Sequence, residues 1–196
     1  MGKVMIIVSM SLDGFVAGPN PRVAAPLGDG GERLHEWMFA AAPHPFDAAV
    51  AGSRFTVETV GAVVMGRTTF DCGVGEWGDD GTFRTPCFVV THRPGEPVVK
   101  GPTTFTFVTD GVDAAVALAQ RAAGEQDVCV MGADVGAQAL RAGLVDELFV
   151  DVVPVLLGEG AHLFHRDGGA PIELERTALV ATPAATHAAF RVIPSR

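Results

Sequence analysis

Short apolar runs separated by glycine- and proline-rich segments are the main pattern along this chain. Residues 4–8, 62–65, 87–91 and 128–131 are nearly continuous in apolar side chains. Strands that are covered on both faces have this pattern, because neither face meets water. Residues 104–109 alternate between apolar and polar side chains instead, which predicts a strand with one wetter face. The pattern therefore predicts a sheet whose central strands are buried.

Amphipathic segments between these runs predict the helices. Helices are expected over 32–42, 46–60, 113–123 and 134–142, and a short helix should open at 67–70. Residues 18–31 and 73–86 lack periodicity and are rich in Gly, Pro and Asp, so they are expected to form long loops, which are often functional in compact domains.

The order of the predicted elements indicates the fold class. Strands and helices alternate first, which favours parallel strands joined by helices. The strands predicted at 147–153, 172–181 and 186–193 then follow one another, and the last two are expected to form an antiparallel hairpin. No linker divides the chain, so residues 1–196 are expected to form a single α/β domain with one mixed, mostly parallel sheet.

Composition excludes several classes of partner. The chain carries a formal net charge of −9 without any Lys/Arg run, so it should repel nucleic acid and anionic lipid. No apolar stretch approaches the roughly 20 residues of a membrane span. The three cysteines form no CxxC pair, which favours a reducing compartment, and the cytoplasm is the expected location. Cys87 and Cys129 lie in apolar runs and are expected to be buried, inert thiols.

Gly66 ends a predicted strand and precedes a predicted helix. Free backbone N–H groups at a helix N-terminus favour an anion, and a glycine lets the backbone approach it closely. Arg67 adds a positive charge, while Thr68 and Thr69 add hydroxyl donors. This segment is a candidate phosphate site, and the alternative is a helix cap beside a surface arginine.

Gly132 forms a second junction of the same kind and is followed by Ala133, Asp134 and Val135. Two such junctions in one sheet suit a pyrophosphate or a dinucleotide lying across the carboxyl ends of the strands. Neither junction has the three spaced glycines of the Rossmann fingerprint. Asp134 is unfavourable beside a phosphate, and its alternative role is an N-cap.

Thr91, His92 and Arg93 follow another predicted strand. His92 and Arg93 could pair with a ribose phosphate, which would favour NADPH over NADH, and the alternative is a polar strand end. His162 and His165 are three residues apart, but no carboxylate or cysteine completes a ligand set, so no metal site is predicted.

Five segments in order carry a family resemblance over nearly the whole chain. They are residues 11–17, 64–71, 91–94, 131–134 and 143–160. The chain resembles the dihydrofolate reductase-like superfamily, specifically the branch that includes the C-terminal reductase domain of riboflavin biosynthesis. The resemblance implies a three-layer fold with helices on both faces of the sheet. Reductase domains of this family are often dimers, so it also suggests a homodimer.

The same resemblance implies NADPH as the hydride donor. Val16 and Ala17 would approach the nicotinamide, and residues 66–69 would hold phosphate. Residues 91–93 would face the adenosine ribose with its extra phosphate, and residues 132–135 would cover the pyrophosphate. The family commonly has two adjacent glycines at the second junction, whereas this chain has Met131 before Gly132.

The leading hypothesis is an NADPH-dependent reductase of a small heterocyclic or imine-type substrate, resembling 5-amino-6-(5-phosphoribosylamino)uracil reductase. The alternatives are a pterin reductase like dihydrofolate reductase, or a dinucleotide-binding protein without turnover. Glu36 and Asp47 are candidates for a folate-binding acid. The reduction needs a general acid. Asp13 is the candidate, and its alternative role is to cap the turn before Gly14.

Overall fold

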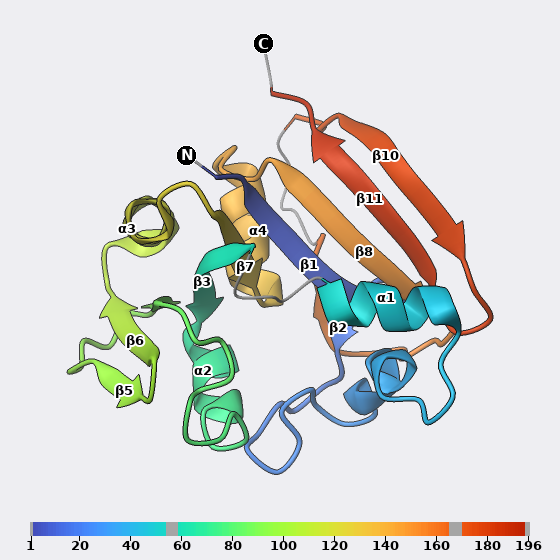
Figure 1. The fold of residues 1–196 in the computed structure, drawn as a ribbon, viewed down its shortest axis with the longest axis horizontal. Coiled ribbons are helices and arrows are strands. Elements are labelled where there is room, and N and C mark those ends of the chain that lie inside the picture. The colour runs from blue at the N-terminus through green and yellow to red at the C-terminus, as the bar shows by residue number, and fades with distance from the viewer. Residues whose placement is uncertain (1, 54–58, 165–169, 195–196) are drawn as a thin grey trace.

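The computed structural model describes residues 2–53, 59–164 and 170–194. Within these residues, nine strands form one sheet in the order β10-β11-β8-β1-β7-β3-β4-β6-β5 (Figure 1). Their bounds are β1 Val4–Ser11, β3 Val60–Gly66, β4 Cys87–Val90, β5 Val98–Lys100, β6 Thr103–Val108, β7 Asp127–Met131, β8 Glu147–Val153, β10 Leu174–Ala181 and β11 Thr186–Val192. A second, antiparallel pair joins β2 (Phe15–Ala17) to β9 (Ala161–His162).

The sheet is mixed and mostly parallel, as predicted. Strands β8, β1, β7, β3, β4 and β6 pair in parallel, so their carboxyl ends share one edge. Strands β10 and β11 form the predicted C-terminal hairpin, and β11 pairs antiparallel with β8. The sequence pattern missed β2, β5 and β9, because strands of two or three residues have too few positions to show a period.

Helices cover both faces of the sheet (Figure 1). Their bounds are α1 Pro45–Ser53, α2 Arg67–Gly73, α3 Gly111–Ala123 and α4 Ala133–Arg141. Helices α3 and α4 pack on the face that carries Ile6 and Val64, whereas α2 packs through Phe70 on the face that carries Met5. None of the helices in the described ranges is long and apolar enough to cross a membrane.

The predicted helix over 32–42 is wrong. Two short 3-10 segments, η1 (Gly31–Leu34) and η2 (Glu36–Met38), stand in its place. Tertiary contacts outweigh helix propensity here, because the Trp37 indole N–H donates to Ser9 Oγ at 3.1 Å and Leu34 is fully buried. The helix predicted over 46–60 ends at Ser53; residues 54–58 of that prediction lie outside the described residues, and Val60 already belongs to β3.

The cysteines are buried and unpaired. Burial raises the pKa of the Cys87 thiol to about 12, and the nearby Cys129 adds to this effect. Burial also raises the pKa of Cys129 to about 12. The prediction that Cys87 and Cys129 are buried is confirmed. A thiol whose pKa is raised in this way stays protonated at neutral pH.

Candidate active site

The three predicted anion-binding segments lie at the same edge of the sheet. Gly66 ends β3, Thr91 follows β4, and Gly132 follows β7. Strands β7, β3 and β4 are neighbours. Their carboxyl ends lie side by side, since Met65 pairs with Met131 and Gly66 pairs with Val90. The structure therefore gathers residues that are up to 66 positions apart at the carboxyl ends of three adjacent strands, where α/β sheets bind ligands.

The junctions at Gly66 and Gly132 touch each other. Gly132 has a φ of +92°, and a Cβ atom built there would lie 2.8 Å from Thr69 Oγ1. On the other side, a Cβ at Gly66 would lie 3.3 Å from Cγ2 of Val135. A glycine is therefore needed at position 132 for two reasons. The positive φ disfavours residues with a side chain, and Thr69 lies too close to leave room for a Cβ atom. The Met131–Gly132 peptide bond is trans.

Asp71 gathers the two predicted phosphate-binding arginines. Arg67 Nε donates to its Oδ1 at 2.7 Å, and Arg93 Nη2 donates to its Oδ2 at 3.3 Å. The Arg67 guanidinium also lies 5.1 Å from the centre of the Phe107 ring, a cation–π distance. Two positive groups against one carboxylate leave this cluster with a net positive charge, although the chain as a whole is acidic.

The turn after β4 is fixed by Thr91. This side chain is buried, and its Oγ1 accepts a hydrogen bond from the Arg93 backbone N–H at 3.1 Å. The Thr91 backbone N–H donates to the Val108 carbonyl at 3.0 Å. His92 and Arg93 are exposed beyond this anchor. The side chains of His92 and Arg93 are thus exposed at the edge of the sheet, directly after the buried Thr91.

Helix α4 begins directly after Gly132, which is its N-cap. Asp134 is therefore not the N-cap, and its exposed carboxylate instead accepts a hydrogen bond from Gln138 Nε2 at 2.8 Å. Val135 points into the core. Gly132 and Ala133 are partly exposed at this junction.

Strand β2 carries Val16 and Ala17 and lies against the long loop. Ala17 pairs with Ala161 of β9. The next residue, Gly18, donates its N–H to the Leu27 carbonyl at 2.8 Å. The loop over 18–31 therefore folds back on the end of β2 and continues into η1.

Asp13 has a structural position at the end of β1. It accepts hydrogen bonds from the backbone N–H groups of Leu157 (3.1 Å) and Gly158 (2.7 Å). The pKa of Asp13 is lowered to about 2. The largest cause is a hydrogen bond with the Ser11 hydroxyl, and these backbone donors lower the pKa further. The carboxylate is therefore ionised at neutral pH. The turn before Gly14 is closed by the Ser11 carbonyl, and a role for Asp13 as general acid stays a prediction.

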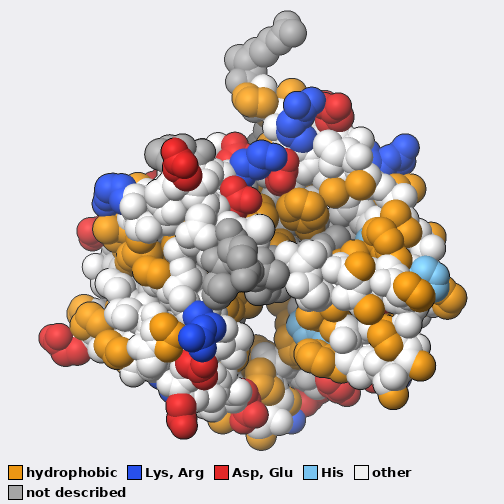
Figure 2. Space-filling view, in the orientation of Figure 1, with side chains coloured by type: hydrophobic (Ala, Val, Ile, Leu, Met, Phe, Trp, Pro, Cys, Tyr) orange, Lys and Arg blue, Asp and Glu red, His pale blue; other side chains and the backbone are white. Residues whose placement is uncertain are grey.

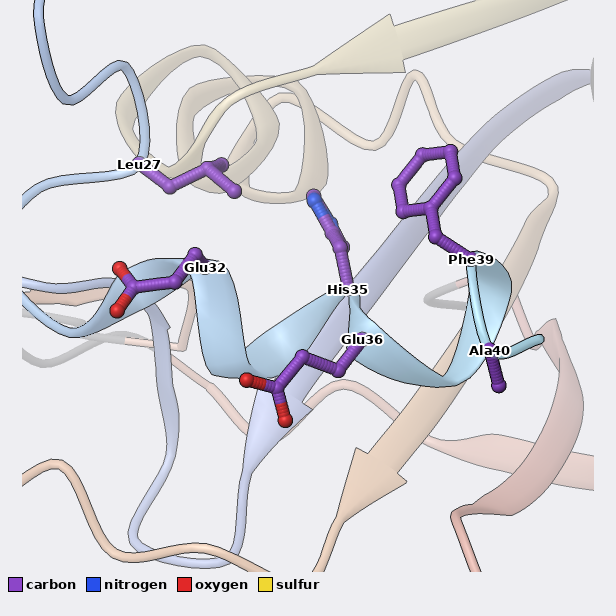
Figure 3. A pocket seen from close by; sticks show the side chains of 6 residues that line it. All are labelled: Leu27, Glu32, His35, Glu36, Phe39 and Ala40. Carbon is purple, nitrogen blue, oxygen red and sulfur yellow. The ribbon is translucent and has the colours of Figure 1, made fainter.

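A pocket of about 570 Å³ lies on the 3-10 segments. The side chains of Leu27, His35 and Phe39 project into the same space, while the carboxylates of Glu32 and Glu36 point away from it (Figure 3). Burial lowers the pKa of His35, and Asp151 opposes this shift. The molecule is hollowed between the part that carries α2 and the part that carries these segments (Figure 2). Sequence reasoning missed the pocket because it assigned this stretch to an ordinary amphipathic helix.

A buried triad lies behind the pocket. His187 Nδ1 is 2.7 Å from Asp151 Oδ1, and its Nε2 is 2.8 Å from Asp47 Oδ1. All three residues are at most 3% exposed. Asp47 and Glu36 are the two candidates for a folate-binding acid. Asp47 contacts His187 in the core, and Glu36 pairs with Arg33 at the surface. The sequence offered one signal for the triad, an aspartate inside the apolar strand 147–153.

Known proteins resemble this chain in sequence or in fold. The RibD C-terminal domain family model matches residues 2–187. The uncharacterized protein YwjB of Bacillus subtilis is 28% identical over 169 residues, covering 83% of each chain. The crystal structure of a "putative riboflavin biosynthesis protein" from Shewanella sp. PV-4 has a TM-score of 0.70 at 21% identity over 98% of this chain and 99% of that one.

Two further structures share the fold at low sequence identity. The Thermotoga maritima diaminohydroxyphosphoribosylaminopyrimidine deaminase/5-amino-6-(5-phosphoribosylamino)uracil reductase has a TM-score of 0.62 at 12% identity, over 98% of this chain and 57% of that one. Dihydrofolate reductase from Enterococcus faecalis, complexed with NADP(H), has a TM-score of 0.57 at 15% identity over 97% and 96%. The fold is therefore dihydrofolate reductase-like, and the chain belongs to the RibD C-terminal domain family.

Proposed function

We propose that this protein is an NADPH-dependent reductase of a small heterocyclic or imine-type substrate, similar to the 5-amino-6-(5-phosphoribosylamino)uracil reductases. The observation that carries the proposal is the pair of arginines, Arg67 and Arg93, held together by Asp71 at the carboxyl ends of β3 and β4. Arginine forks suit phosphate oxygens, and the edge of the sheet is where such a ligand would lie.

The residues at the edge fit a dinucleotide phosphate. Gly132 lacks the Cβ that would crowd Thr69, so backbone and hydroxyl donors stand close together there. In the proposal, residues 66–69 and 132–135 hold the pyrophosphate, while Val16 and Ala17 approach the nicotinamide. When bound, NADPH supplies the hydride, and the protein positions the acceptor against it.

Preference for NADPH over NADH is assigned to Arg93 with His92. The ribose 2′-phosphate is the only part of NADPH that NADH lacks, and it carries about two negative charges near neutral pH, as other phosphomonoesters do. Arg93 is 69% exposed and can turn toward such a group, whereas Arg67 is held by Asp71 and lies near two aromatic rings. Arg93 would therefore meet the 2′-phosphate and Arg67 the remaining phosphates.

The pterin alternative is less well supported by the geometry. The resemblance to dihydrofolate reductase implies an acidic side chain that binds the pterin ring. Asp47 is 1% exposed and contacts His187, and Glu36 pairs with Arg33 at the surface. The pocket beside β2 favours an enzyme over a protein that only binds the dinucleotide, because it offers space for an acceptor.

A fluorescence titration with NADPH and NADH tests the proposal. Binding of NADPH, followed by its consumption with one of three probes (7,8-dihydropterin, a ribosylaminopyrimidine phosphate or menadione), is the expected result. Absence of NADPH binding would reject the cofactor. Binding without consumption of NADPH in the presence of any probe would favour the protein without turnover.

Other expectations from the sequence remain proposals. These are a single domain over residues 1–196, a cytoplasmic location, a homodimer, and a small-molecule partner rather than nucleic acid or membrane. Sedimentation of the purified protein would test the homodimer directly.

A further inference from the structure

The pocket on the 3-10 segments lies beside the strand proposed to face the nicotinamide. Leu27 forms part of its wall, and the carbonyl of this residue accepts the N–H of Gly18, directly after Ala17. Gly31 also packs against Gly18, since a Cβ atom on Gly31 would lie 2.9 Å from the Gly18 nitrogen. The end of β2 is therefore in direct backbone contact with two parts of the segment that borders the pocket, at Leu27 and at Gly31.

His35 is the polar side chain that projects into this pocket between two apolar ones, Leu27 and Phe39 (Figure 3). The six lining residues include no Lys or Arg. An uncharged ring fits such a lining better than an anion, because an anion would lose its hydration without gaining a cation. Phe39 is 80% exposed and offers a face on which a flat ring can stack.

The segment that carries His35 is anchored on a buried polar row. Trp37 donates its indole N–H to Ser9 Oγ, and Ser9 is the register partner of Asp151 in the neighbouring strand. Asp151 in turn contacts His187, the next residue in the same row. The backbone that carries His35 is thus anchored on the sheet beside the strand of Asp151, whose charge acts on the imidazole.

We propose that His35 delivers the proton in the reduction, with the acceptor ring lying between Leu27 and Phe39. The inference rests on the proposed function and names a residue of the same site. When a carbon of the acceptor receives the hydride of NADPH, the π electron pair of its C=N bond moves to the nitrogen. That nitrogen takes the proton from the His35 imidazolium. The neutral imidazole that remains then takes up a new proton from water.

The charged groups around His35 set the direction of its pH dependence. Glu32 and Glu36 lie on its own segment and Asp151 faces it from β8, with His187 of β11 and Asp47 of α1 behind Asp151. Burial lowers the pKa of His35 below its usual 6.5, and Asp151 limits this effect. Since the protonated form is the donor, kcat/KM should rise as the pH falls toward that lowered pKa.

The test compares three variants of the full-length protein. His35→Gln keeps a hydrogen-bonding side chain but removes the titrating group, and His44→Gln is the matched control, since His44 is exposed and lies outside the pocket. Asp13→Asn tests the rival donor. We expect kcat of His35→Gln to fall about 10²-fold or more, within the usual range for a general acid. The affinity for NADPH should stay within a factor of two of the wild type.

The pH profile separates proton delivery from a structural role. His35→Gln should lose the rise of kcat/KM at low pH, whereas His44→Gln should keep it. A loss of activity with an unchanged pH profile, or a full loss of pH dependence in Asp13→Asn, would overturn the assignment to His35.

A second measurement does not depend on the variants folding. The imidazole C2–H resonance of His35 in the wild-type protein, saturated with NADP⁺, should move when the probe reduced in the turnover assay is added. If NADPH binds but no probe is reduced and none moves this resonance, the inference is wrong while the cofactor site stands. If NADPH does not bind at all, the proposed function itself fails.

Discussion

Gly132 and Thr69 stand so close that a Cβ on the glycine would lie 2.8 Å from the threonine Oγ1. This contact joins the β7–α4 junction to the β3–α2 junction, and it places the accessible backbone of one beside the hydroxyl of the other. The two junctions therefore form one continuous surface, which in the proposal binds the phosphates of the dinucleotide. Their contact also predicts how a substitution at either residue affects the other.

Gly132→Ala should destabilise the protein and weaken dinucleotide binding. A methyl group crowds Thr69, and a φ of +92° with a ψ of 149° is a region that residues other than glycine rarely adopt, at a cost of about 1–3 kcal/mol. Urea unfolding and an NADPH titration measure the two effects. Gly143→Ala is the control for backbone strain alone, because Gly143 has a φ of +69° and open space around it. Equal binding losses in both variants would contradict a local role for Gly132.

Arg93→Ala should weaken NADPH more than NADH. A charge-assisted hydrogen bond contributes about 1.5–3 kcal/mol, and for an exposed side chain we expect the lower end, about tenfold in Kd for NADPH. The Kd for NADH should change by less than a factor of two. Fluorescence titrations at one fixed salt concentration give both values, since phosphate contacts are sensitive to screening.

Arg84→Ala is the matched control for this experiment. Arg84 is also exposed and also pairs with an aspartate, Asp80, but it lies outside the proposed cofactor site. Its loss changes the net charge of the protein equally. If Arg84→Ala weakens NADPH as much as Arg93→Ala does, the effect is one of overall charge and the 2′-phosphate contact is rejected.

His187→Ala should lower the free energy of unfolding by about 3–5 kcal/mol, because deleting the imidazole removes two buried contacts to carboxylates at once and leaves a cavity. Here both Asp47 and Asp151 would lose their contact with the imidazole. Urea unfolding at neutral pH measures the loss, and His92→Ala, at an exposed histidine away from the triad, should cost less than about 0.5 kcal/mol. A loss that small in His187→Ala would show that the triad contributes little to stability.

The central strands of the sheet could be predicted from the sequence because they are largely buried. The run over 128–131 became β7, and the predicted strand 147–153 matches β8 at both ends. That the three candidate anion-binding segments meet at one edge could also be predicted, since Gly66, Thr91 and Gly132 each lie at the end of a buried strand or directly after it. That they bind one ligand is implied by the resemblance and stays a proposal.

The pocket and the triad could not be predicted in the same way. His35 lies where apolar spacing favoured a helix, yet the Trp37–Ser9 hydrogen bond and the burial of Leu34 hold the backbone in 3-10 turns. Asp47 and His187 are 140 residues apart, and their contact depends on how α1 crosses the hairpin strands. Such tertiary placements leave no periodic trace in a single sequence.

Asp13→Asn should change the acid stability of the protein in a definite direction. The folded state lowers the pKa of Asp13 from 3.8 to about 2, so its ionised form is favoured by folding. The resulting stabilisation is fully present above pH 3.8 and is lost as the pH falls toward 2. Wild type should therefore be more stable than Asp13→Asn at neutral pH, and the difference should shrink through this interval. Unfolding by urea at a series of pH values gives the curve. Asp79→Asn, at an exposed carboxylate, controls for the loss of one negative charge from an acidic chain. A difference that stays constant down to pH 2 would mean that folding does not lower the pKa of Asp13, and it would contradict the prediction.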